Sequence, residues 1–200
     1  MKRIILSLFL SSTLMLTGCK NENQTADERV DEHTNLTQQE EEAGPGDTYV
    51  QDELTLQIEP RSGSNVSGTV TFVQEDDEVT MTAEVSGLEE GMHAIHLHEN
   101  ADCSAQDGTS AGGHWNPTFE DHGEWGDAGG YHRGDIGNFD VNSNGEGSIT
   151  FTTDKWCIGC EDDKKNILNK AVIIHAGADD YTSQPSGNAG TRVGCAEIKM

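Results

Sequence analysis

The sequence predicts an all-β domain, either a sandwich or a flattened barrel, over residues 52–200. Two observations support this class: apolar residues recur at every second position in several short runs, and short polar linkers separate those runs. Such alternation is typical of strands that bury one face. Only residues 161–170 could hold a single helical turn. Several short strands with frequent turns therefore favour a sandwich or barrel.

The strands can be placed in order along the chain. Leu54, Leu56 and Ile58 alternate with polar residues, and the runs 66–72 and 79–85 repeat the pattern. Linkers at 74–78 and 87–91 have the composition of hairpin turns. Further strand-like runs lie near 148–153, 170–175 and 193–198.

The N-terminus has the features of an export signal. Lys2 and Arg3 precede an apolar run at 4–16, which is too short to span a bilayer. The run ends in "LTGC", which resembles the lipobox of bacterial lipoproteins. That resemblance implies a signal peptide at 1–18, cleaved before a lipidated Cys19. The alternative is an ordinary secreted protein with a leftover cysteine.

Residues 19–51 are expected to form a disordered, acidic tether that joins the lipid to the domain. Acidic residues dominate this stretch, and its few apolar residues show no period. His33 is interpreted as a bystander there. The whole chain carries a formal net charge of −24. This charge argues against nucleic acid and anionic membrane surfaces as partners, because both repel it.

The cysteines predict disulfide bonds. The chain has five, and four remain if Cys19 is lipidated. Export permits disulfides, so one or two bridges are expected. The remaining cysteines are Cys103, Cys157, Cys160 and Cys195.

The segment 100–135 is glycine-rich and has no periodicity. A loop of this length inside a compact domain needs something to order it. Its cysteine, its histidines and Asp135 suggest a disulfide and a metal ion, which can both order a loop without a core.

The histidines predict a metal site. His96 and His98 lie two apart in a predicted strand and therefore face the same side, whereas His93 has the opposite parity and points inward with Ile95 and Leu97. Two four-coordinate sites need eight ligand positions, and seven candidates can fill them if one imidazole bridges both ions. The candidates are His96, His98, His114, His122, His132, His175 and Asp135.

At this point the sequence resembles copper/zinc superoxide dismutase. The matching stretches run in the family's order through the domain. They are "HAIHLHE", "AGGHWNP", "DHG", "HRGDIGN", "IIHAGADDY" and "GNAGTRVGC". The resemblance implies an eight-stranded Greek-key β-sandwich of immunoglobulin-like architecture. It also implies an enzyme that converts superoxide to oxygen and hydrogen peroxide with one copper and one zinc ion per chain.

The resemblance also implies roles for single residues. Copper would be bound by His96, His98, His114 and His175, and zinc by His114, His122, His132 and Asp135. His114 would be the bridge and would carry a proton during turnover. Asp179 would orient one copper ligand and one zinc ligand, and His93 would support the copper site without binding it. Arg192 would dock the anionic substrate, and Cys103 would pair with Cys195.

Two features depart from the family pattern. The segment between His175 and Arg192 contains no lysine or arginine, which predicts weak electrostatic steering. Cys157 and Cys160 in "WCIGC" lie outside the shared motifs. A local disulfide is the first interpretation, and a Cu(I)-binding role is the alternative.

Three functions compete at this stage. The first is an active dismutase that protects the cell envelope, lipid-anchored on its periplasmic or outer side. The others are a copper-buffering lipoprotein on the same scaffold and a structural lipoprotein that binds zinc only. The sequence leaves a homodimer and a monomer equally open.

Overall fold

A computed structural model describes residues 52–200 of the chain. The predicted signal peptide, Cys19, His33 and the acidic tether lie outside the described residues. The described strands are β1 (Asp52–Pro60), β2 (Ser67–Glu75), β3 (Glu78–Ser86), β4 (Gly91–His98), β5 (Gly137–Val141), β6 (Glu146–Thr153), β7 (Ala171–His175) and β8 (Arg192–Glu197). Within residues 52–200, no helix is long and apolar enough to cross a membrane.

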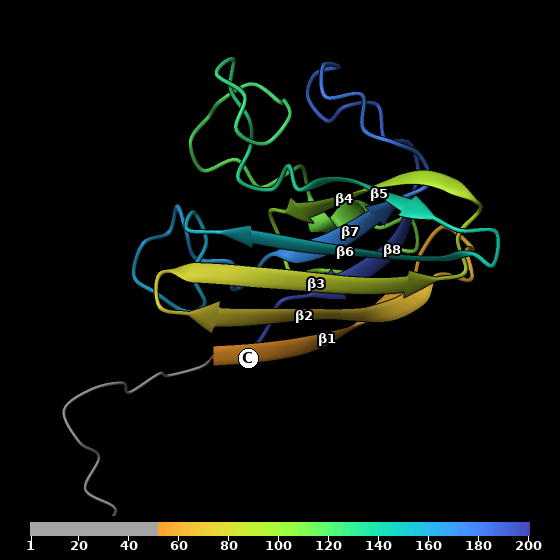
Figure 1. Ribbon diagram of the computed structural model, residues 1–200, viewed down its shortest axis with the longest axis horizontal. Coiled ribbons are helices and arrows are strands. Elements are labelled where there is room, and N and C mark those ends of the chain that lie inside the picture. Colours follow the sequence, from red (N-terminus) through yellow and green to blue (C-terminus); the bar gives the residue numbers. More distant parts are fainter. Residues whose placement is uncertain (1–51) are drawn as a thin grey trace, which may run out of the picture. The chain divides into compact units, whose positions relative to one another are not determined.

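The eight strands close into an antiparallel barrel in the order β1-β2-β3-β6-β5-β4-β7-β8, and β8 returns to pair with β1 (Figure 1). This confirms the all-β class and the barrel alternative. The strongest pairings join β1, β2, β3 and β6 along most of their lengths. Strands β5 and β6 share only the pair Val141 and Gly147, so the barrel is least tightly closed there.

The barrel interior is a continuous apolar core. Phe72 and Met81 from β2 and β3 meet Ile95 and Leu97 from β4, and all four are fully buried. The alternation seen in the sequence therefore separates an inner from an outer face, as expected for half-buried strands.

Strands β4 and β7 are buried on both faces. Their inner residues join the core, and Ala171 and Ile173 on the outer face of β7 pack in a second cluster with the disulfide Cys103–Cys195. A loop therefore covers the outer face of this strand pair. His96 pairs with Ile173 and His98 with Ala171, so both histidines share that covered outer face.

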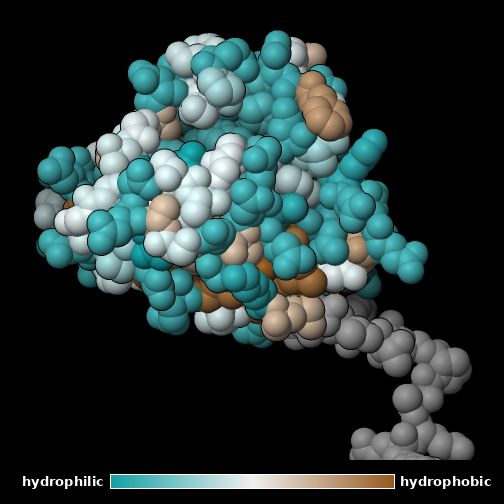
Figure 2. Space-filling view, turned by 180° about the vertical axis from the view of Figure 1, so that it is seen from behind, coloured by the Kyte–Doolittle hydropathy of each residue, from teal (hydrophilic) through white to brown (hydrophobic). Residues whose placement is uncertain are grey.

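The segment 161–170 contains a single helical turn, because Asn166 N–H donates to the carbonyl of Asp162, four residues earlier, at 2.9 Å. The helix assigned within residues 52–200 is a short 3-10 turn, η1 (Thr109–Ala111), inside the long loop. Two long segments project from the same side of the barrel, one between β4 and β5 (green) and one between β7 and β8 (blue) (Figure 1). The visible face in Figure 2 is largely hydrophilic, with apolar residues in small separate groups, in keeping with the acidic composition.

Candidate metal centre

The first cluster combines histidines from two neighbouring strands and one loop. His96 and His98 come from β4, His175 ends β7, and His114 is held against β4 by a bridge to His98. One ring nitrogen from each of the four lies within 4.8 Å of the others, and all four side chains are buried. Strand pairing thus brings together residues that are far apart in the sequence.

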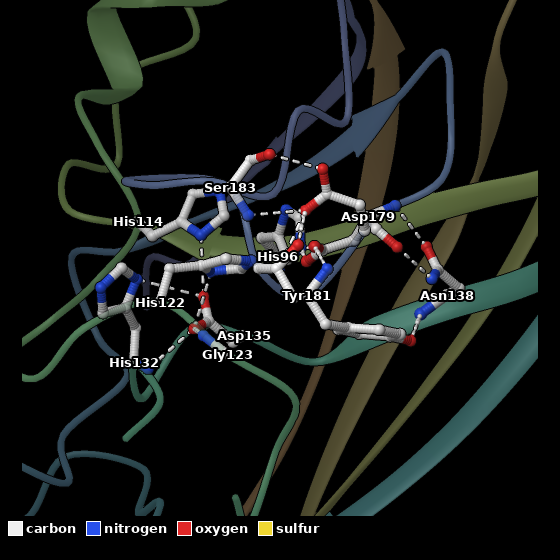
Figure 3. A network of polar contacts seen from close by, with 12 residues as sticks. His96, His114, His122, Gly123, His132, Asp135, Asn138, Asp179, Tyr181 and Ser183 are labelled. Carbon is white, nitrogen blue, oxygen red and sulfur yellow. Dashed lines mark hydrogen bonds and ion pairs between the residues drawn. The ribbon is translucent and has the colours of Figure 1, made fainter. Parts of the chain in front are cut away.

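The second cluster gathers around one carboxylate in the loop between β4 and β5 (Figure 3). Asp135 Oδ1 lies 2.8 Å from His114 Nδ1 and 3.2 Å from His132 Nδ1, and Asp135 Oδ2 lies 3.0 Å from His122 Nδ1. A tetrahedral ion with bonds of about 2.0 Å separates its ligand atoms by about 3.3 Å. The observed distances are close to that spacing.

His114 belongs to both clusters. Its Nδ1 faces Asp135 in the second cluster, and its Nε2 is the ring nitrogen left for the first. His114 is therefore placed to act as a ligand that bridges two metal ions.

Both ends of the loop that carries the second cluster are fixed to β4. Trp115 N–H donates to the carbonyl of Leu97 at 2.8 Å, Leu97 N–H donates to Gly134 at 2.9 Å, and Gly134 N–H donates to Trp115 at 2.9 Å. The loop therefore leaves and returns beside the strand that bears His96 and His98.

The ring nitrogens that face the two clusters can bind metal ions, because no hydrogen bond within residues 52–200 occupies them. Six buried imidazole nitrogens lack a hydrogen bond: His96 Nδ1, His98 Nε2, His114 Nε2, His122 Nδ1, His132 Nδ1 and His175 Nε2. His122 Nδ1 and His132 Nδ1 are close to Asp135, but not in hydrogen-bonding directions. An unsatisfied buried polar group costs about 1–3 kcal/mol, so six of them in one place indicate a missing common partner. All-nitrogen ligands suit copper, and three histidines with one carboxylate suit zinc.

The opposite nitrogen of most of these rings is held by the protein. His98 Nδ1 faces the carbonyl of Gly112 at 3.0 Å, and His175 Nδ1 faces that of Gly190 at 3.4 Å. A carbonyl can only accept a hydrogen bond, so Nδ1–H is the donor and Nε2 keeps its lone pair. This is the tautomer that a metal ligand requires.

The electrostatics of the two clusters differ. Burial, together with neighbouring imidazoles, lowers the pKa values of His98 and His175 well below the usual value. Burial also lowers the pKa of His114 to about 4, although Asp135 opposes the shift. These rings are neutral donors at pH 7.

The second cluster instead favours positive charge. Burial lowers the pKa of His122, but Asp135 and Asp179 outweigh it and raise the value to about 9. Burial opposes ionisation of Asp135 as well, yet the surrounding histidines hold its pKa far below the usual range. Both shifts show that the carboxylates favour positive charge at the second cluster, and a divalent metal ion would supply that charge in place of the proton on His122.

Asp179 connects the two clusters without belonging to either. Its Oδ2 lies 2.8 Å from His96 Nε2 and its Oδ1 lies 2.9 Å from His122 Nε2 (Figure 3). Asn138, which the sequence analysis missed, fixes the backbone of Asp179 through two hydrogen bonds of 2.7 and 2.9 Å. Tyr181 N–H donates to Asp179 Oδ1 at 2.7 Å. The aspartate is therefore held in place on all sides.

Arg192 lies at the end of the first cluster. It pairs with His175 across β7 and β8, and its charge contributes to the lowered pKa values of His98 and His175. The guanidinium donates from Nη1 to the carbonyl of Gly108 at 2.7 Å, and Ser62 Oγ donates to the Arg192 carbonyl at 2.8 Å. Burial lowers the pKa of Arg192, but a guanidinium stays cationic at any physiological pH.

His93 is buried and lies in neither cluster. Its Nδ1 lies 2.9 Å from the carbonyl of His175, and its Nε2 lies 2.9 Å from the carbonyl of Glu89. The contact of His93 Nδ1 with the carbonyl of His175 supports the backbone of that residue from the inner side of the sheet.

Residues 52–200 contain two disulfides. Cys103 is joined to Cys195, 92 residues later, with Cα atoms 5.9 Å apart. This bond ties the loop that contains Gly108 to the strand that contains Arg192. The second joins Cys157 to Cys160.

Comparisons with known proteins agree with this architecture. The family model described as copper/zinc superoxide dismutase matches residues 66–198. A protein of Deinococcus radiodurans named superoxide dismutase [Cu-Zn] is 36% identical over 143 residues, which are 65% of this chain and 75% of that protein.

Solved structures of a SOD-like protein from Bacillus subtilis are also similar. A double mutant of that protein has 32% identity and a TM-score of 0.65, and covers 73% of this chain and 97% of its own. The crystal structure of the SOD-like protein itself has 30% identity and a TM-score of 0.64, and covers 72% of this chain and 97% of its own. Since a family match over most of the barrel accompanies two histidine clusters that share one imidazole, this chain belongs to the copper/zinc superoxide dismutase family.

Proposed function

We propose that the two clusters form a copper/zinc centre that catalyses the dismutation of superoxide. Copper would be held by His96, His98, His114 and His175, and zinc by His114, His122, His132 and Asp135. The observation that carries this proposal is the set of buried imidazole nitrogens that have no hydrogen-bond partner among residues 52–200. When bound, copper would supply one-electron redox chemistry, by which two superoxide anions and two protons give one oxygen and one hydrogen peroxide.

The protein's own residues prepare this reaction in three ways. Arg192 presents a fixed cation to a small anion beside the copper cluster, and the Gly108 carbonyl orients its planar fork. With Nδ1 directed to the zinc cluster beside Asp135, Nε2 would be the His114 nitrogen that takes up and returns a proton. Asp179 fixes the rings of His96 and His122 from outside, which maintains their tautomers.

The experiment is metal analysis of the purified protein together with a dismutation assay, with and without Arg192→Ala. We expect one copper and one zinc per chain, activity in the wild type, and a large loss of activity in Arg192→Ala with both metals retained. Copper-loaded wild-type protein without activity would refute the proposal and favour copper buffering. Protein that takes up zinc but no copper would favour a structural role.

We further propose that the enzyme acts in the cell envelope and protects it from oxidative damage, anchored to the membrane through a lipidated Cys19. The support is the sequence "LTGC" after an apolar signal run. Several acyl chains on one cysteine give stable anchoring. Detergent partitioning of the wild type, compared with Cys19→Ser, tests this: the variant should move to the aqueous phase. The same preparations would distinguish homodimer from monomer by mass.

A further inference from the structure

The loop between β6 and β7 carries a feature that the proposed function does not use. It contains Trp156 and the disulfide Cys157–Cys160, and contributes no member of either histidine cluster. Trp156 is 1% exposed, so it is one of the largest fully buried side chains of the described protein. A buried indole N–H needs an acceptor.

That acceptor lies inside the metal-binding segment. Trp156 Nε1–H donates to the carbonyl of Arg133 at 2.8 Å. Arg133 is the residue immediately after His132 and stands between two members of the second cluster, His132 and Asp135. The turn is closed locally, because His132 N–H donates to Asp135 Oδ2 at 2.7 Å.

The indole ring touches a second point of the same segment. Trp125, which lies between His122 and His132 in the chain, packs edge-on against Trp156 with ring centroids 5.9 Å apart. Trp125 also packs against Phe151 of β6 at 4.7 Å, and Phe151 packs against Trp156 at 5.1 Å. Trp156 therefore holds the segment on both sides of His132, once by a hydrogen bond and once by aromatic packing.

The loop that follows Trp156 is fixed by a disulfide and by hydrogen bonds, which restricts the position of the indole ring. The disulfide closes it between Cys157 and Cys160, and Ile158 N–H donates to Gln74 Oε1 at 2.6 Å, which ties the loop to β2. Asn166 accepts from Gly159 N–H and donates to the carbonyl of Cys160. The ring thus rests on the barrel and not on the metal-binding segment that it contacts.

We propose that Trp156 is a positioning residue for the zinc cluster, and that the Cys157–Cys160 loop is the rigid base that holds it. The inference rests on the proposed zinc site and adds a residue to its support. Outer contacts of this kind set ligand orientation and metal affinity. Its effect is expected on zinc retention, because the hydrogen bond of Trp156 to Arg133 and its ring contact with Trp125 both fall on the segment around His132.

The test compares Trp156→Phe with wild type as metal-loaded proteins, in a competition assay with a chromogenic chelator that reports zinc and copper release separately. Phenylalanine keeps an aromatic ring but removes the donor. Loss of one net hydrogen bond predicts zinc release on the order of threefold to tenfold faster, with copper release changed less than zinc release.

Val70→Ala is the matched control, because Val70 is fully buried in β2 and should weaken the barrel without a zinc-specific effect. Equal zinc release from Trp156→Phe and wild type would overturn the inference. So would an equal acceleration in Val70→Ala, since that would show a loss of overall stability alone. Wild-type protein that takes up no zinc would instead overturn the proposed metal centre itself, together with this inference.

Discussion

Gly187 occupies a position that only glycine can fill without displacing Asp179. Its φ is +63°, and a Cβ added there would lie 1.7 Å from Asp179 Oδ1 and 2.6 Å from His122 Nε2. Asp179 cannot simply turn away, because Oδ1 accepts from Tyr181 N–H at 2.7 Å and Oδ2 contacts His96. Gly187→Ala is therefore expected to break the contact between Asp179 and His122.

The magnitude follows from two parts. A left-handed backbone costs a non-glycine residue about 1–2 kcal/mol. An ordinary contact needs more than 3 Å, so the carboxylate oxygen or the loop must shift by more than 1 Å, and the charged hydrogen bond at 2.9 Å is lost. Such a bond contributes about 1.5–3 kcal/mol. The sum predicts a loss of about 2.5–5 kcal/mol in the free energy of unfolding.

Gly63→Ala separates these two parts. Gly63 has a similar φ of +73°, but a Cβ there would meet nothing within 4 Å. Denaturant unfolding of both variants, with zinc release in parallel, should show a small loss for Gly63→Ala and a larger one for Gly187→Ala, with faster zinc release in Gly187→Ala only. Equal losses of stability and unchanged zinc release in both variants would refute the argument from the clash.

Three further predictions follow from the same contacts. Asp179→Asn keeps the shape but removes the charge shared by the two clusters, so zinc affinity should fall about 10- to 100-fold in a chelator competition; unchanged affinity would contradict the assigned role. Replacing Cys103 and Cys195 by serine removes a disulfide that closes a loop of 92 residues. The free energy of unfolding, measured with denaturant, should fall by about 4–5 kcal/mol relative to the oxidised wild type. The segment between His175 and Arg192 carries no basic residue, so the second-order rate constant for superoxide should fall only shallowly with ionic strength; a steep fall would show that cations elsewhere steer the substrate.

Most of the strands could be predicted from their apolar residues, most clearly where those residues alternate with polar ones. The alternation through Leu54–Ile58 and the runs at 66–72 and 79–85 correspond to β1, β2 and β3. Strand β5 (Gly137–Val141) was not predicted, because it is short, follows a long irregular segment and has few alternating apolar residues. The 3-10 turn η1 was missed for a related reason: its one buried side chain, Ala111, packs against the disulfide and not against the barrel core.

The metal-binding candidates could be found from the sequence, because histidine is a common metal ligand and these histidines stand in motifs that match the family. The resemblance implied the supports Asp179 and His93, but not the residues that hold Asp179. Asn138 is an ordinary polar residue until the fold brings it against Asp179, 41 residues away in the chain, and Tyr181 acts through its backbone N–H. Gly187 is one of many glycines, and its necessity comes from the oxygen that lies 1.7 Å from its missing Cβ.

The same distinction explains why Trp156 was overlooked. The motif "WCIGC" draws attention to its cysteines, whose chemistry is visible in the sequence, whereas the tryptophan acts through a backbone carbonyl that any residue could supply. Every residue has a backbone carbonyl, so the identity of residue 133 does not reveal that it accepts this hydrogen bond. Residues that hold a metal centre from outside are therefore found by asking which buried donors end on the segments that carry the ligands. In this barrel, Trp156 meets that description, because its indole N–H donates to the carbonyl of Arg133 from a loop that carries no ligand.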